Sequence, residues 1–381
     1  MSENLIIVGT PSFNEEDNIS HVTQTADEGL ETYFPESEAV IVNLDQSEDD
    51  TREHFLATET TFPKEYVRPG PEIGKGRSLI SLLEYADERA EDFDNVCILT
   101  IDADITSVQP AWIEKLATPV LETDVNFVTA NYERNRYEGN TTNHFCYPLV
   151  SAIYDCDLRQ PIAGDFSMDY EACKTFLSAP KTPAVYRYGI DYFFSLTALE
   201  NDLNVKESSL GKKIHKPSFG KMVPMFREIA ATTFFLLSRG DHTGTTRSIE
   251  GINNSSAIAD YVDKPSQEAV EERLDTAVGL LTELSGEDAT DCEPISTGFV
   301  KNKIQQQCLT REMWCDILGQ FLRYIDGRSV STEEANRLAE VITPFYLLRV
   351  LTYFENIEGK SKAEVEIELE EQKTRLKEAI D

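Results

Sequence analysis

Two aspartates separated by a single residue follow an apolar run in the first third of the chain. The run, Val96–Ile101, has the composition of a buried parallel strand, and Asp102 and Asp104 come at its carboxyl end. In open α/β sheets, ligands bind outside the carboxyl ends of the strands. Paired carboxylates at such an edge are suited to a divalent cation, or to a ribose and a cation together. The alternative is that both are loop carboxylates that cap the helix expected near Pro110.

Two earlier strands are expected to bring polar side chains to the same edge of the sheet. Thr10, Pro11 and Glu15 follow the first apolar run, and Asp45 ends the second. Because the carboxyl ends of parallel strands meet at one edge, these residues are expected near the two aspartates. Helix capping and turn formation are the other explanation for each residue taken singly.

Lys75 lies between two glycines at the expected start of a helix. An ammonium group and the free amides of a helix N-terminus can both bind phosphate oxygens. A solvent-exposed lysine is the alternative. The Gly-Lys-Gly sequence lacks the spacing of a phosphate-binding P-loop, and the chain has no GxGxxG fingerprint, so neither an ATPase nor a typical dinucleotide-binding enzyme is indicated.

Short apolar runs alternate with amphipathic stretches over the first 130 residues, which predicts an α/β fold with a mostly parallel, Rossmann-like sheet. The predicted strands are 5–8, 39–42, 66–67, 96–101 and 125–128, and the predicted helices between them are 17–30, 50–57, 75–90 and 110–121. Further helices are predicted at 222–237, 268–284, 310–325, 332–341, 344–355 and 363–379. We therefore expect a first domain over residues 1–240 and an all-helical domain over residues 257–381.

The chain carries a large excess of acidic residues. It has 35 Lys and Arg against 68 Asp and Glu in 381 residues, a formal charge of -33. Such a surface repels nucleic acid and anionic lipid, so neither is expected as a partner. Salt screens the repulsion among the carboxylates, which suggests a halophilic source. No apolar run is long enough for a signal peptide or a membrane span, and the seven cysteines lack metal-binding spacing, so we expect a cytoplasmic protein with reduced thiols.

Taken together, these motifs resemble those of nucleotide-sugar glycosyltransferases with the GT-A fold. The resemblance rests on Thr10-Pro11 with Asn14-Glu15-Glu16, on Gly74-Lys75-Gly76 and on Asp102-Ala103-Asp104, within about residues 5–240. Four further segments narrow it to the retaining enzymes that make mannosylglycerate or glucosyl-3-phosphoglycerate. These segments are Ile105–Ser107, Gln160–Asp165, Tyr188–Asp191 and His215.

The resemblance implies an enzyme that binds a nucleoside-diphosphate sugar together with a metal ion. It implies that Asp104 and His215 hold Mg²⁺ or Mn²⁺ on the diphosphate, and that Asp102 contacts the ribose or the outer shell of the metal. Both cations accept carboxylate oxygens, and Mn²⁺ also accepts an imidazole. By the same resemblance, the donor is bound by Thr10, Pro11, Glu15, Asp45, Lys75 and Asp102.

The resemblance also implies an acidic acceptor at the loop after the fifth strand and at the Gln-Pro loop. The residues concerned are Arg134, Arg136, Gly139, Asn140, Thr141, Thr142, Gly164 and Asp165. Arginines suit an anion, although both could equally pair with neighbouring glutamates. Asn140 stands where phosphoglycerate enzymes tend to have arginine, which leaves open whether the acceptor is phosphorylated. Asp191 and Asp102 are the candidate catalytic carboxylates, and helix capping is the alternative for Asp191.

The sequence thus predicts a hexosyltransferase that moves a hexose from a nucleoside-diphosphate sugar to a small hydroxy acid, glycerate or 3-phosphoglycerate, with retention at the anomeric carbon. Making a compatible solute would suit the salt-adapted composition. Two alternatives stay open: a polysaccharide or lipid-phosphate acceptor, or a non-catalytic scaffold that binds sugar nucleotides. The apolar stretch Tyr346–Phe354 suggests a face for a homodimer.

Overall fold

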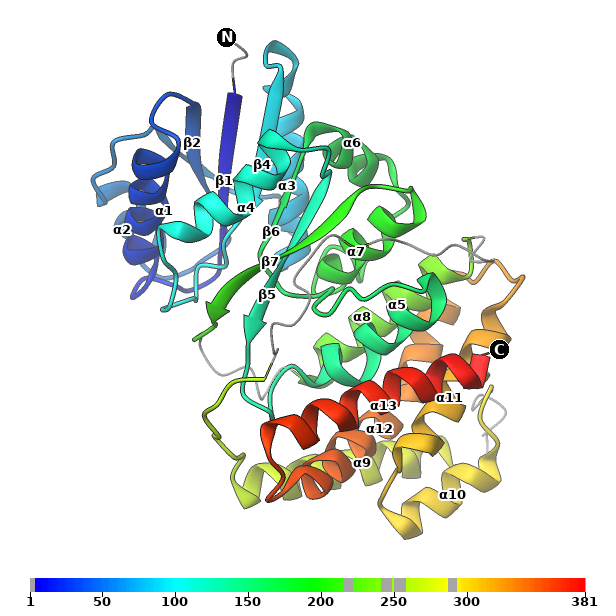
Figure 1. Ribbon diagram of the computed structural model, residues 1–381. Coiled ribbons are helices and arrows are strands. Elements are labelled where there is room, and N and C mark those ends of the chain that lie inside the picture. Colours follow the sequence, from blue (N-terminus) through cyan, green and yellow to red (C-terminus); the bar gives the residue numbers. More distant parts are fainter. Residues whose placement is uncertain (1–3, 216–221, 241–248, 250–257, 287–292, 381) are drawn as a thin grey trace. The chain divides into compact units, whose positions relative to one another are not determined.

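The protein is described from a computed structural model over residues 4–215, 222–240, 249, 258–286 and 293–380 (Figure 1). The chain divides into two compact units. Unit 1 comprises Met1–Glu133, Arg159–Phe219 and Ser248–Ser255, and unit 2 comprises Arg134–Leu158, Gly220–Arg247 and Ser256–Asp381. This division differs from the expected one between residues 240 and 257, because α5 (Tyr147–Tyr154) and α8 (Met222–Leu237) group with the C-terminal helices.

Unit 1 contains a seven-stranded sheet in the order β3-β2-β1-β4-β6-β5-β7. Its strands are β1 (Asn4–Ser12), β2 (Glu38–Asp45), β3 (Lys64–Val67), β4 (Asn95–Thr100), β5 (Phe127–Glu133), β6 (Phe166–Met168) and β7 (Val205–Lys212). All neighbours pair in parallel except β6, which runs antiparallel to β4 and to β5. The predicted mostly parallel α/β sheet is confirmed, and β6 and β7 have no counterpart among the predicted strands.

Helices cover both faces of this sheet. They are α1 (Ile19–Tyr33), α2 (Thr51–Ala57), α3 (Lys75–Asp87), α4 (Ala111–Glu122), α6 (Tyr170–Ser178) and α7 (Ile190–Glu200), with a short 3₁₀ turn at Ala90–Asp92. Successive side chains of a strand point to opposite faces. Along β1, Val8 shares a buried core with Val22 of α1 and Ile113 of α4. Its neighbour Gly9 lies against Leu82 of α3, where a Cβ would come within 2.2 Å of that side chain. Thus α1 and α4 cover one face, and α3 covers the other.

The strands that carry the predicted site end at one edge of the sheet. The register pairs Ser12 of β1 with Asp45 of β2, and Gly9 of β1 with Thr100 of β4. Since these three strands are parallel, the residues that follow them share the edge at which α/β proteins bind ligands. The fold therefore gathers the polar strand ends as the sequence predicts.

Unit 2 is built from helices (Figure 1). Besides α5 and α8 they are a π-helical turn at Thr142–Cys146, α9 (Gln267–Leu284), α10 (Thr297–Gln306), α11 (Arg311–Ile325), α12 (Thr332–Ile357) and α13 (Lys362–Ile380). Aromatic stacking joins them around α12: the ring of Phe226 in α8 lies 3.8 Å from that of Tyr346. The helix Met222–Leu237 coincides with the predicted 222–237, and α10 has no predicted counterpart.

Two expectations about α12 are wrong. The sequence predicts two helices that meet before Pro344, but Pro344 lies inside one continuous helix. Proline removes one backbone donor, and burial of that segment on all sides compensates for the loss. The stretch Tyr346–Phe354 is buried within unit 2 rather than presented to a second subunit. Among the helices that the structure describes, none is long and apolar enough to cross a membrane.

Candidate functional site

Lys75 lies between two carboxylates at the carboxyl edge of the sheet. Its Nζ is 2.9 Å from an Oδ of Asp102, which follows β4, and 3.3 Å from an Oδ of Asp191, in the first turn of α7. All three side chains are mostly buried. Burial disfavours the ammonium, yet the nearby carboxylates outweigh it and raise the pKa of Lys75. The structure thus brings together three residues that the sequence nominated from separate segments.

A second lysine extends this arrangement. Lys213, just after β7, places its Nζ 2.8 Å from Asp165 and 3.4 Å from Asp102. We call Lys75, Lys213, Asp102, Asp165 and Asp191 the lysine–aspartate cluster. Burial alone would raise the pKa of Asp102, but the two ammonium groups outweigh burial and lower it. Asp102 is therefore held as a carboxylate.

Asp104 lies next to the cluster and forms no ion pair with the residues that the structure describes. Burial, and then the charge of Asp102, raise the pKa of Asp104. His215 lies alongside, because Ile105 and His215 form an antiparallel bridge and the Thr106 amide donates to the carbonyl of Ile214 at 2.9 Å. The two predicted metal ligands therefore come from adjacent backbone segments.

The charges of this region suit a divalent cation. The lysine–aspartate cluster holds three carboxylates and two ammonium groups, and Asp104 brings the net charge to two negative. Within the described residues no group of three or more His, Cys, Asp or Glu side chains is arranged to hold a metal. Mg²⁺ is commonly bound by one or two protein ligands together with substrate phosphates, so Asp104 and His215 fit an ion that arrives with a diphosphate.

Asp45 lies in a hydrogen-bonded pocket at the end of β2. Its Oδ1 accepts from the hydroxyls of Ser12 at 2.7 Å and Ser47 at 2.5 Å, and its Oδ2 accepts from Tyr66 at 3.1 Å. The Thr10 hydroxyl is fully buried and lies 3.4 Å from a backbone carbonyl of β2. These contacts fix the strand ends.

Two other residues that the sequence predicts to bind the sugar nucleotide lie beside this pocket. Pro11 pairs with Leu44 across β1 and β2. Glu15 is buried, and its amide donates to the Thr51 hydroxyl at 2.9 Å.

The start of α3 differs from the sequence-based expectation. The amides of Gly76 and Arg77 donate to the carbonyls of Arg187 and Tyr186 at 3.0 and 2.8 Å. A Cβ on Gly76 would lie 1.9 Å from a backbone oxygen, so glycine permits this close approach. These two amides are therefore committed to backbone carbonyls, and the expectation that they bind phosphate is wrong. The Lys75 ammonium remains a candidate for binding an anion here.

Gly164 lines the space between the charged groups. It has φ +97°, and a Cβ there would lie 2.6 Å from Asp102 Oδ2, 3.1 Å from Lys213 Nζ and 3.3 Å from Lys75 Nζ. A side chain at this position would fill the space that the two lysines and Asp102 surround. The need to keep this space open explains the glycine at position 164 better than a direct contact with the acceptor substrate does.

The other acceptor candidates belong to unit 2 and make contacts within it. Arg136 donates from Nη1 to the Lys360 carbonyl at 2.5 Å, and Asn140 donates to the Tyr137 carbonyl at 2.8 Å. Thr141 shares a hydrogen bond of 2.9 Å with Tyr346. Gly139 has φ +63°, Thr142 is buried in the π-helical turn, and Arg134 forms a parallel bridge with Ile258.

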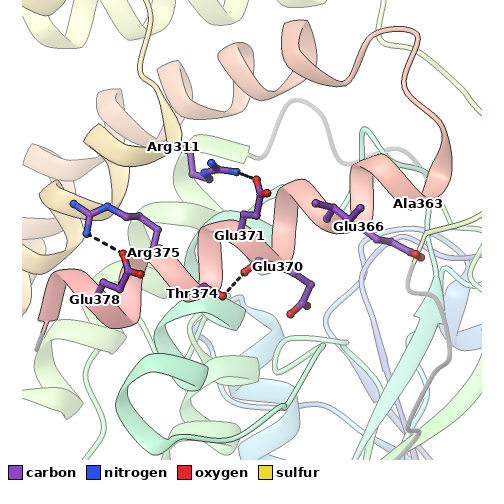
Figure 2. A pocket seen from close by; sticks show the side chains of 9 residues that line it. Arg311, Ala363, Glu366, Glu370, Glu371, Thr374, Arg375 and Glu378 are labelled. Carbon is purple, nitrogen blue, oxygen red and sulfur yellow. Dashed lines mark hydrogen bonds and ion pairs between the residues drawn. The ribbon is translucent and has the colours of Figure 1, made fainter.

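A pocket of about 590 Å³ lies on unit 2 between α11 and α13 (Figure 2). Its charged residues already pair with one another: Arg311 with Glu371, and Arg375 with Glu378. It contains none of the residues nominated from the sequence. We do not place the chemistry there.

Three residues of the site have no place in the sequence-based prediction: Lys213, Tyr132 and Gln46. The Gln46 side chain donates to the Glu72 carbonyl at 2.5 Å and accepts from the Gly74 amide at 3.0 Å, which ties the loop before Lys75 to the end of β2. Gln46 directly follows Asp45 at the end of β2, and this position in the sequence could have identified it as a site residue. Lys213 and Tyr132 can be identified as site residues only from the register of the sheet.

Comparison with solved structures gives related chains of low identity. Glucosyl-3-phosphoglycerate synthase from Mycobacterium tuberculosis, in complex with Mn²⁺, UDP and phosphoglyceric acid, is 21% identical with a TM-score of 0.48, over 61% of this chain and 78% of that one. Its complex with Mg²⁺ and UDP is 22% identical with a TM-score of 0.47, over the same shares. A mycobacterial protein is 22% identical with a TM-score of 0.48, over 61% and 74%. No curated protein matches the sequence.

The mostly parallel sheet, with acidic residues following the strands at its carboxyl edge, has the arrangement of a GT-A, Rossmann-like fold. Residues 7–174 match the model of glycosyl transferase family 2, and this match supports a glycosyltransferase that uses a nucleotide sugar. The match spans β1 to α6 and includes Lys75, Asp102 and Asp104.

Proposed function

We propose that the protein transfers a hexose from a nucleoside-diphosphate sugar to a small hydroxy acid, glycerate or 3-phosphoglycerate, in a Mg²⁺- or Mn²⁺-dependent reaction that retains the anomeric configuration. The lysine–aspartate cluster and the neighbouring Asp104 carry this proposal, because together they combine a cation for a diphosphate with carboxylates for a metal and a sugar. The mycobacterial synthase, which is similar in sequence at 21% identity, was solved with UDP, Mn²⁺ and phosphoglyceric acid.

In this proposal the donor lies along the carboxyl edge of the sheet. Thr10, Pro11, Glu15 and Asp45 bind its base and ribose, and Asp102 binds the ribose. The protein already holds the Asp45 carboxylate at the strand end by hydrogen bonds from two hydroxyls. Lys75 binds a diphosphate oxygen through its Nζ, where a charge-assisted hydrogen bond is strong.

Asp104 and His215 would hold the metal on the diphosphate. The bound ion neutralises charge that builds on the departing diphosphate. Asp191 holds a hydroxyl of the transferred sugar, since its carboxylate faces the same lysine that faces Asp102. We favour departure and attack on one face of the sugar, because no carboxylate of the cluster is free of a lysine to act as a covalent nucleophile.

Acceptor binding is proposed for Arg134, whose guanidinium suits a carboxylate. The proposal extends to Arg136, Gly139, Asn140, Thr141 and Thr142, which belong to unit 2 as Arg134 does. Synthesis of a compatible solute in a salt-rich cytoplasm would agree with the charge of -33.

The test is a transfer assay in high salt with UDP-glucose, GDP-mannose and ADP-glucose, each with Mn²⁺ and with glycerate or 3-phosphoglycerate. Proton NMR of the product gives the anomeric configuration. We expect transfer to one of the two acceptors with retention. Transfer only to a polysaccharide or lipid phosphate would overturn the proposal that the acceptor is a small hydroxy acid. A product with the inverted anomeric configuration would overturn the one-face mechanism. Binding of the sugar nucleotide without transfer to any acceptor would favour the scaffold alternative.

A further inference from the structure

Asp165 is fully enclosed, and its two carboxylate oxygens are both occupied. Oδ1 accepts from the Asp102 amide at 2.7 Å. Oδ2 accepts from the Tyr132 hydroxyl at 2.5 Å and from Lys213 at 2.8 Å. Its side chain has no exposed surface. A carboxylate with these contacts has no oxygen left for an acceptor, so its part in the reaction must act through its neighbours.

Lys213 is likewise used in full by the protein. Its ammonium donates to Asp165, to the Ala163 carbonyl at 3.1 Å and to Asp102 at 3.4 Å, and the ring of Tyr132 lies 4.9 Å away. An ammonium group has three protons, and each has an acceptor here. With 5% of its side chain exposed, Lys213 lies beneath Asp102 rather than in solvent.

Stability alone is a poor reason for such a pair. Taking two charges out of water is costly, and apolar side chains of similar volume are often equally stabilising. What the pair supplies is orientation. Asp165 fixes the backbone of Asp102, and Lys213 fixes its side chain, while Asp104 follows two residues later.

We propose that Asp165 and Lys213 are positioning residues for Asp102 and Asp104, with Tyr132 holding Asp165 in place. This inference rests on the proposed function, since it says how Asp102 and Asp104 are held in position in that site. It gives Asp165 a role different from acceptor binding. Lys75 pairs with Asp102 and Asp191, whereas Lys213 pairs with Asp102 and Asp165.

The test compares Asp165→Asn, Lys213→Met and the double variant with the wild-type protein. Thermal unfolding gives Tm, titration with Mn²⁺ and UDP gives the affinity, and the transfer assay gives kcat and KM per folded enzyme. Asp169→Asn is the matched control, because Asp169 is also a partly buried aspartate of unit 1 but caps α6 by accepting from the Ala172 amide at 2.7 Å. Asparagine caps helices as well as aspartate does.

We expect both single variants to lose about 10–100-fold in kcat, as is typical when a partner of a metal-site ligand is removed. Lys213→Met should also lower Tm, because it leaves Asp165 buried without its cation. In the double variant Tm should recover, since no charge is left unpaired at that point, whereas kcat should stay low. The Asp169→Asn control should retain kcat.

Recovery of both Tm and kcat in the double variant would show that the pair only stabilises the fold, and would overturn the inference. An Asp165→Asn variant with unchanged kcat would also overturn it. These failures are distinct from a failure of the proposed function, in which the wild-type protein itself would bind neither Mn²⁺ with UDP nor a sugar nucleotide.

Discussion

Lys75 and Asp102 face each other across 2.9 Å although they are distant in the sequence and start from different elements. Lys75 begins α3, and Asp102 follows β4. The pair is possible because the start of α3 and the end of β4 meet at the carboxyl edge of the sheet. A nucleoside diphosphate that binds here would meet an ammonium group already ordered by two carboxylates.

Lys75→Met should weaken the binding of UDP in the presence of Mn²⁺ by about 10–100-fold, because a charge-assisted hydrogen bond is lost. It should also lower the free energy of unfolding by about 3 kcal/mol, since Asp102 and Asp191 lose a shared cation. Calorimetric titration and denaturant unfolding measure the two effects. Arg77→Met is the control: this partly exposed arginine pairs with Glu84 at 3.2 Å and should matter little. Equal effects of both substitutions on UDP affinity would contradict the assignment.

Gly164→Ala should reduce transfer by about 100-fold, because the new methyl group displaces Asp102 and both lysines from their positions. The positive φ adds about 1–3 kcal/mol of backbone strain. Gly359→Ala matches that strain, with φ +74° and open space around the Cβ. The control should lose stability but keep its activity, as measured by thermal unfolding and initial rates. Retention of full activity by Gly164→Ala would mean that the space beside Asp102 is not used.

Glu207 should make stability depend on pH near neutrality. This buried residue of β7 accepts from the Gln160 amide at 2.8 Å, and burial raises its pKa from 4.5 to about 7 despite that hydrogen bond and the charge of Arg159. The folded protein keeps a proton that the unfolded chain loses above pH 4.5, so stability falls as pH rises from about 4.5 to 7. The total loss in the free energy of unfolding over this pH range is on the order of 3 kcal/mol.

Glu207→Gln mimics the protonated acid and should remove this loss. Denaturant unfolding at several pH values should show the variant more stable than the wild type above pH 7, with a difference that shrinks toward pH 4.5. Glu88→Gln, at a largely exposed position, should show no such trend. A difference that does not change with pH would contradict the raised pKa of Glu207.

Arg349→Met should destabilise unit 2 by about 1–3 kcal/mol, because a buried hydrogen bond from a charged group is lost. The guanidinium is fully buried, donates to Gln372 at 2.9 Å and lies 3.3 Å from Glu368, which keeps Arg311 and Lys360, each 3.6 Å away. Lys362→Met removes a pair of 3.2 Å with the exposed Asp260 and should cost less than 1 kcal/mol. Denaturant unfolding measures both. Equal losses would indicate that the buried pair contributes no more than a surface pair.

Strand ends and helix periodicity were sufficient to predict the central part of unit 1. The runs around Val8, Ile41 and Ile98 are buried on both faces of a parallel sheet, so their composition alone identifies them. Because such strands end at one edge, the place of Asp102 beside the other strand ends follows from topology, whereas Asp191, in the first turn of α7, was nominated only from the family resemblance.

Lys213 was not predictable in the same way. The register of β5 and β7 shifts between Asn131 and Tyr132, which faces Gly211 at φ +78°. A shift of one residue exchanges the two faces of a strand. It turns Lys213 inward and leaves Lys212 exposed. Local sequence shows only two adjacent lysines. The continuous α12 escaped prediction for a related reason, because burial within unit 2 outweighs the local effect of Pro344.

The central claim is that Asp104 and Lys75 form a metal-dependent site for a nucleoside-diphosphate sugar. The most direct measurement is transfer from UDP-glucose or GDP-mannose to glycerate or 3-phosphoglycerate in high salt, with and without Mn²⁺, for the wild type, for Asp104→Asn and for the surface control Asp94→Asn. The account predicts Mn²⁺-dependent transfer by the wild type and the control, and loss of about 100-fold or more in Asp104→Asn. Transfer that is independent of the metal, or that Asp104→Asn leaves unchanged, would contradict it.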